Sequence, residues 1–130
     1  MSEIVTVIIP LFNGQQTILR CLDSLKSQTY KNIEVIIVND GSTDCSAKLA
    51  KKYIQDNKLN GWQLHTIPNG GVAKARNFGI AMATGEYLCF VDADDYLTKN
   101  SIYEKAINIL EKENVEVVTW LWQYEQQGKY

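Results

Sequence analysis

The chain has 130 residues, of which 45% are hydrophobic, and this size and composition fit one domain with one buried core. Its 13 basic and 15 acidic residues give a formal net charge of -2, which provides no positive field for wrapping nucleic acid. We therefore expect one domain over residues 1–130 and no nucleic-acid partner.

The cysteines and the N-terminus indicate the cellular compartment in which the protein is expected. The 3 cysteines are odd in number and far apart, which indicates neither a disulfide framework nor a zinc site. The N-terminus lacks the basic segment of a signal peptide, and no apolar run approaches the ~20 residues needed to cross a bilayer. Together these features predict a protein of the reducing cytoplasm.

The first half of the chain alternates between strand and helix patterns. Residues 5–9 form a short apolar run rich in β-branched side chains, typical of a strand buried on both faces. Residues 15–28 repeat apolar side chains at the spacing of an amphipathic helix. A second β-branched run at 33–38 predicts another strand, and turn-forming residues after it lead into a helix over 43–55.

The second half continues this alternation. A weaker strand is predicted at 62–67, a helix at 72–83, and a strand at 87–91. A helix over 101–113 follows, and an apolar segment at 115–122 predicts the last strand. Buried strands joined by helices predict a three-layer α/β/α fold around a mostly parallel sheet.

Polar loops follow each of the first four predicted strands. They are residues 10–13, 39–44, 69–71 and 92–95. Ligands of open α/β sheets bind beyond the carboxyl ends of the strands. Four separate loops would therefore rim one crevice, and we predict a binding site there.

Three carboxylates stand close together in the last of these loops. Asp92, Asp94 and Asp95 directly follow the apolar run at 87–91. Acids packed this tightly repel one another unless a cation, a hydrogen-bond donor or water relieves them. Mg²⁺ and Mn²⁺ take oxygen ligands and are often held by one or two carboxylates together with substrate phosphates. The cluster therefore predicts a divalent metal site and a phosphorylated ligand.

Other residues of these loops allow two interpretations each. Arg76, near the start of the third helix, is either a solvated surface charge or a ligand of a phosphate or base carbonyl. Phe12 either packs in the core or lines the mouth of a pocket. Asp40 is either a simple turn residue or part of the site. We assign no role in catalysis to His65, the sole histidine.

Several enzyme classes fit the sequence poorly. A dinucleotide-dependent oxidoreductase needs a glycine fingerprint after the first strand, which residues 10–14 lack, and a P-loop NTPase needs a Gly-Lys-Ser/Thr motif, which is missing. The glycine-rich loop of a sugar nucleotidyltransferase is not evident either. Two alternatives stay open: a metal-dependent phosphatase with Asp92 as its nucleophile, and a nucleotide-binding module without activity of its own.

Four segments in order resemble the family 2 glycosyltransferases, which have the GT-A fold. They are Val7 to Asn13, Val38 to Asp44, Asn69 to Gly79 and Phe90 to Asp95. The resemblance extends from residue 5 to about residue 97 and covers the family's donor-binding half. It implies that residues 1–130 are a single nucleotide-sugar-binding domain, truncated so that the acceptor-binding C-terminal part is absent.

The resemblance also implies roles for individual residues. Phe12 and Asp40 would contact the nucleotide base, usually uracil, with Pro10 in the same wall; Phe12 stands where Tyr is common, so a phenol hydroxyl is absent. Asp92 would lie near the ribose, and Asp94 would bind the metal ion, with Asp95 sharing or replacing it. The implied donor-binding residues are Pro10, Phe12, Asn13, Asp40, Arg76, Asp92, Ala93 and Asp94, and the implied metal ligands are Asp92, Asp94 and Asp95.

The reaction that the family implies is a metal-dependent, inverting transfer with Mn²⁺ or Mg²⁺. The sugar would pass from a nucleoside-diphospho-sugar, expected to be a UDP-sugar, to a hydroxyl of a saccharide or lipid-linked acceptor in bacterial surface polysaccharide synthesis. The general base of such enzymes lies well downstream of the Asp-x-Asp motif, so we expect it beyond Tyr130. Relatives with lipid-linked acceptors leave open a membrane association of the full-length enzyme. An exposed apolar strand at 115–122, carrying Trp120 and Trp122, would favour self-association.

Overall fold

The computed structural model describes residues 3–119. The strands are β1 (Val5–Leu11), β2 (Ile33–Asp40), β3 (Trp62–Ile67) and β4 (Tyr87–Phe90), and the helices are α1 (Ile18–Lys26), α2 (Ser46–Asp56), α3 (Val72–Met82) and α4 (Ile102–Lys112). The four strands form one parallel sheet in the order β3-β2-β1-β4. The predicted α/β class is confirmed. Among the helices described, none is long and apolar enough to span a lipid bilayer.

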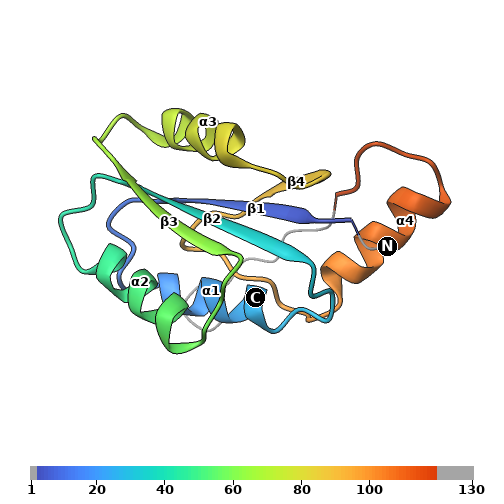
Figure 1. The fold of residues 1–130 in the computed structure, drawn as a ribbon, viewed down its shortest axis with the longest axis horizontal. Helices are drawn as coiled ribbons and strands as arrows, with labels where there is room; N and C mark the ends of the chain where they lie inside the picture. The colour runs from blue at the N-terminus through green and yellow to red at the C-terminus, as the bar shows by residue number, and fades with distance from the viewer. Residues whose placement is uncertain (1–2, 120–130) are drawn as a thin grey trace, which may run out of the picture.

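The sheet lies between two helical layers (Figure 1). The helices α1 and α2 cover one face, and α3 covers the other. The chain steps outward from β1 through β2 to β3, and α3 then carries it back across the sheet to β4, on the other side of β1. The strand order therefore reverses between β1 and β4. In open α/β sheets this reversal marks the crevice in which ligands bind, beyond the carboxyl ends of the strands.

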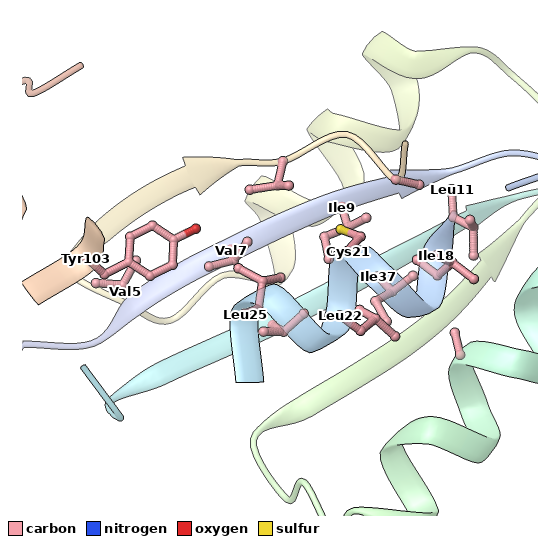
Figure 2. Close-up of a cluster of buried hydrophobic side chains, with 14 of the residues drawn as sticks. Val5, Val7, Ile9, Leu11, Ile18, Cys21, Leu22, Leu25, Ile37 and Tyr103 are labelled. Atoms are coloured by element: carbon pink, nitrogen blue, oxygen red, sulfur yellow. The ribbon is translucent and has the colours of Figure 1, made fainter. Parts of the chain in front are cut away.

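Alternate side chains of β1 build the larger part of the core. Figure 2 shows Val5, Val7 and Ile9 on the side of the sheet that faces α1, where they meet residues such as Leu22. Tyr103 of α4 joins the same cluster and is only 2% exposed. Because successive side chains of a strand point to opposite faces, the residues between them are left for the helix on the other side.

The opposite face holds a smaller cluster under α3. Its buried members are Ile36, Val38, Ile67 and Ala75. Gly79 lets α3 approach the sheet closely, because a Cβ atom at this position would lie 2.4 Å from Cγ2 of Ile8. This close packing on β1 determines where the N-terminal half of α3, with Arg76, lies relative to the strand ends.

Several boundaries differ from the sequence prediction. β1 extends to Leu11 and β2 to Asp40, beyond the predicted ends at residues 9 and 38, and α2 begins at Ser46 rather than at residue 43. α1 begins at Ile18 rather than at residue 15, because Gln15 bonds to the loop before α2 and residues 15–17 form a turn. The strand predicted at 115–122 is wrong over residues 115–119, which form no strand. A strand needs a neighbour to take up its hydrogen bonds, and an apolar run alone does not supply one. The rest of that segment, with the tryptophans on which self-association was predicted, lies outside the described residues.

A polar network lies at the amino ends of β1 and β2, next to the segment that leads from α3 into β4. The hydroxyl of Thr6 donates to Glu34 Oε1 at 2.7 Å and accepts the amide of Gly85 at 2.9 Å. Thr84 donates its amide and its hydroxyl to the two carboxylate oxygens of Glu34, at 2.9 and 2.7 Å. Burial raises the pKa of Glu34, but these hydrogen bonds outweigh it and hold the pKa below its ordinary value.

We expect Gly79→Ala to lower the free energy of unfolding by about 1–3 kcal/mol, because the added methyl group overlaps with Ile8. Urea unfolding measures this change. In an Ile8→Ala background the methyl group meets neither Cγ atom, so the same substitution should cost less. An equal cost in both backgrounds would contradict the contact.

Stability should depend on pH through Glu34. Its pKa is lower in the folded chain than in the unfolded one, so its contribution is present above the unfolded-state pKa and is lost as the pH falls through the folded-state pKa. Urea unfolding of the wild type and of Glu34→Gln, from neutral pH to about pH 3, checks this. The difference in unfolding free energy should shrink toward acid pH, and a constant difference would rule out the assignment.

Candidate functional site

A cleft of about 900 Å³ opens at the carboxyl edge of the sheet. The loops after all four strands contribute to its walls, as the topology predicts. The lining includes Pro10 at the end of β1, with Phe12 and Asn13 after it; Asp40 at the end of β2, with Asp44 after it; Asn69 and Gly71 before α3, with Arg76 in its first half; and Asp92, Ala93 and Asp94 after β4. The structure thus brings every residue of the predicted donor-binding set to one cleft, and the role of each in binding stays a prediction.

The three carboxylates after β4 lie together. One oxygen of each of Asp92, Asp94 and Asp95 lies within 4.8 Å of those of the other two, with Asp94 exposed and its neighbours half-buried. The amide of Asp95 donates to the carbonyl oxygen of Asp92 at 2.9 Å, which closes a turn. Three carboxylates fit a hard divalent cation such as Mg²⁺ or Mn²⁺, whose charge would relieve their mutual repulsion.

This cluster influences the groups around it. Burial, followed by the charges of Asp94 and Asp92, raises the pKa of Asp95 above its ordinary value, whereas Arg20 lowers it. Cys21 lies buried on α1, and burial first, then the three carboxylates, raises its pKa to about 12. Its thiol therefore stays protonated at neutral pH and donates to the carbonyl oxygen of Asp92, with 3.7 Å between sulfur and oxygen.

Arg76 brings a positive charge to the same cluster. Its Nη2 donates to Asp92 Oδ1 at 3.1 Å, and its guanidinium carbon lies 6.0 Å from the centre of the Phe90 ring. Its Nε is buried and finds no hydrogen-bond partner within residues 3–119. The side chains of Arg76 and Asp92 are 39% and 47% exposed, so this ion pair is open to solvent, and a guanidinium is a group that also binds phosphate oxygens.

Asp40 is buried and anchors the loop that begins α3. Its Oδ1 accepts the amide of Gly70 at 2.8 Å, and its Oδ2 accepts the amide of Gly71 at 3.0 Å. The side-chain amide of Asn69 donates to the carbonyl oxygen of Asp40 at 2.9 Å. Gly71 has a φ of 98°, a backbone conformation that other residues rarely adopt. Each carboxylate oxygen of Asp40 keeps a second lone pair, so a contact with a ligand stays compatible with this anchor.

Phe12 stands at the mouth of the cleft. Its side chain is 53% exposed, so the interpretation as a core residue is wrong. Pro10, half-buried at the end of β1, lines the same cleft. Of the residues interpreted as structural, His65 lies within β3, where it bonds to Gln63 and packs against the ring of Phe78. The structure therefore leaves the ring of Phe12 available to a ligand.

Two residues outside the predicted donor-binding set shape the cleft. Gln15 donates its amide to Asp44 Oδ2 at 3.1 Å, and its side-chain carbonyl oxygen accepts the amide of Cys45 at 3.0 Å. Asn69 holds the end of β2 through its bond to Asp40. The two glycines after Asn69 signal a turn, but no local signal marks Gln15, because only folding brings it to its partners.

We expect Asp40→Ala to lower the free energy of unfolding by about 2 kcal/mol, since two loop amides lose a charged acceptor. Asp40→Asn keeps one acceptor oxygen and should cost less. Asp56→Ala is the control, because within residues 3–119 the carboxylate of Asp56 makes only an exposed ion pair with Lys52, which contributes less than about 1 kcal/mol. Equal losses for the two alanine variants in urea unfolding would contradict the anchor.

Known proteins resemble this chain along its whole length. The family model described as glycosyl transferase family 2 matches residues 6–130. The glycosyltransferase GlyG of Streptococcus pneumoniae is 37% identical over 127 residues, which are 97% of this chain and 42% of that protein. The uncharacterized glycosyltransferase YibD of Escherichia coli is 42% identical over 112 residues, 86% of this chain and 32% of that protein.

Two solved structures share the fold. S. aureus TarS in complex with UDP-GlcNAc superposes with a TM-score of 0.73 at 36% identity, over 84% of this chain and 32% of that one. The mannosyltransferase PcManGT from Pyrobaculum calidifontis, in complex with GDP-Man and Mn²⁺, gives a TM-score of 0.80 at 28% identity, over 85% and 33%. The chain spans less than half the length of each of these relatives. With its parallel sheet, its four-loop cleft and these matches, the chain belongs to glycosyl transferase family 2 and has the GT-A fold.

Proposed function

We propose that the cleft binds a nucleoside-diphospho-sugar together with Mn²⁺ or Mg²⁺, as the donor site of an inverting glycosyltransferase. The observation that carries the proposal is the arrangement of the cleft: an exposed aromatic, Phe12, and the anchored Asp40 line it together with Arg76 and the carboxylates Asp92 and Asp94. TarS with UDP-GlcNAc and PcManGT with GDP-Man and Mn²⁺ support a ligand of this class.

The parts of the cleft match the parts of such a donor. An exposed aromatic ring suits stacking on a nucleotide base, and a carboxylate with free lone pairs suits a base N–H; Phe12 and Asp40 therefore receive the base, with Pro10 beside them. A guanidinium suits phosphate oxygens, so Arg76 would leave Asp92 for the diphosphate. We keep UDP as the expected nucleotide.

Charge explains how these groups would assist transfer. Asp94, with Asp92 and Asp95, would hold a divalent ion, which would supply Lewis-acid stabilisation of the negative charge on the departing diphosphate. Arg76 adds a positive charge at the same end of the cleft. We assign no general base within residues 3–119. On the family resemblance we extend the proposal to an acceptor hydroxyl on a bacterial surface polysaccharide or its lipid-linked precursor, made on the cytoplasmic side.

The phosphatase alternative accounts for less of the cleft, and the binding module differs from the transferase only in turnover. In a phosphatase, Asp92 would be the nucleophile, but one of its oxygens is paired with Arg76. Phe12, which lines the same cleft, would then have no role in binding. A binding module without activity would bind the same nucleotide. Turnover of a UDP-sugar by the full-length protein separates this second alternative from the transferase.

Calorimetric titration of the chain with UDP, and with GDP in parallel, tests the proposal. We expect binding in Mn²⁺ that weakens at least about tenfold when the metal is removed, because the diphosphate then faces the carboxylates without a cation. Asp94→Ala should remove the dependence on Mn²⁺, whereas the exposed Asp56→Ala should retain it. Failure of both nucleotides to bind, or equal binding without metal, would refute the proposal.

A further inference from the structure

The loops after β1 and β2 are tied together by a contact that we call the loop clasp, residues 13–15 with residues 42–45. Asn13 Oδ1 accepts the amides of Thr43 and Asp44 at 2.8 and 3.3 Å, and the hydroxyl of Thr43 at 3.3 Å. In the other direction, the amide of Asn13 donates to Ser42 Oγ at 3.0 Å. Residues about 30 positions apart in the sequence are thereby held side by side.

Gln15 extends the loop clasp toward α2. Its amide and side chain bond to Asp44 and to the amide of Cys45, and Asp44 Oδ1 accepts the amide of Ser46, the first residue of α2, at 2.9 Å. At the other end, the side-chain oxygen of the buried Asn39 accepts the amide of Ser42 at 3.1 Å. The partner loop of Asn13 is therefore fixed to both β2 and α2.

Asn13 is suited to this position by its backbone as well as by its side chain. Its φ of 49° lies in the left-handed region, which asparagine tolerates better than most residues. Three donors converge on its side-chain oxygen, so this atom is used within the protein. The turn at Asn13 immediately follows Phe12 and thus sets how that ring stands at the cleft.

We propose that Asn13 is a positioning residue for nucleotide recognition, which acts by holding Phe12 in place in the cleft that Asp40 also lines. The inference rests on the proposed donor site. The side chain of Phe12 is 53% exposed in the part of the chain that the structure describes, whereas Asp40 is buried and fixed by the amides of Gly70 and Gly71. The loop clasp joins the loop that carries the exposed Phe12 to the loop that follows the anchored Asp40. If the loop that carries Phe12 is already held before binding, it loses less conformational entropy when the ligand binds, and the affinity is higher.

Two substitutions of Asn13 separate its backbone from its side chain. Asn13→Gly keeps the left-handed conformation and removes the acceptor, and we expect it to weaken UDP binding in Mn²⁺ about tenfold. Asn13→Asp keeps both the conformation and an acceptor but adds a charge beside Asp44. It should restore most of the affinity. Mn²⁺ binding without nucleotide should be the same in both variants as in the wild type, because the carboxylates after β4 are untouched.

A double-mutant cycle with Phe12→Leu shows whether Asn13 acts through Phe12. Leucine keeps an apolar side chain, so residual binding stays measurable, but it has no ring to position. In this background, Asn13→Gly should change UDP affinity by less than about twofold. Ser42→Ala removes one bond of the loop clasp from the other side and should give a smaller loss that also depends on Phe12. It decides the question if Asn13→Gly does not fold.

The outcomes distinguish this inference from the proposed function. Wild-type binding of UDP or GDP with unchanged binding by Asn13→Gly overturns the role of Asn13 and leaves the donor site standing. The same loss with and without Phe12→Leu also overturns it, since Asn13 would then act on the fold alone. A wild-type chain that binds neither nucleotide overturns both.

Discussion

The carboxylate of Asp40 accepts two amides of the loop that begins α3, and the organisation of the cleft depends on this contact. It ties the end of β2 to the helix that carries Arg76, and Arg76 in turn pairs with Asp92 after β4. On the other side of Asp40, the loop clasp ties β2 to β1. The polar groups of irregular loops need partners, and here the four loops supply them to one another. The cleft is consequently shaped before a ligand enters.

The carboxylates after β4, in contrast, repel one another. Asp92, Asp94 and Asp95 lie close enough to repel one another when charged. Burial, and after it the charges of Asp94 and Asp92, raises the pKa of Asp95, while Arg20 lowers it and Arg76 pairs with Asp92. The buried Cys21 stays neutral and so adds no further negative charge to the cluster. A bound cation would remove the repulsion, so by linkage it would stabilise the folded chain as well as the site.

The sequence predicted those features that depend on residues adjacent in the chain. The β-branched runs predicted β1 and β2, and weaker or apolar runs predicted β3 and β4. The position of Asp92, Asp94 and Asp95 directly after an apolar run predicted the acidic cluster. The loop clasp and the late start of α1 escaped prediction because they depend on register: β1 pairs with β2 so that Leu11 stands opposite Asn39, which brings the two loops together. The local sequence pattern of each strand does not specify the register in which the two strands pair. The expected strand at 115–119 failed for a related reason, since an apolar pattern does not specify a pairing partner.

Under the proposed function, the two ends of the cleft divide the work of binding. The end with Phe12 and Asp40 is held by internal hydrogen bonds, so it changes little when a base arrives and can reject a base of the wrong shape. The end with Arg76 and the carboxylates has a guanidinium Nε without a partner among the described residues and like charges in contact, so it gains most from a diphosphate and a cation. Selectivity for the nucleotide then arises mainly at the rigid end, and the free energy of binding mainly at the charged end. Such a division lets the base be recognised independently of the metal, while transfer depends on both ends being occupied.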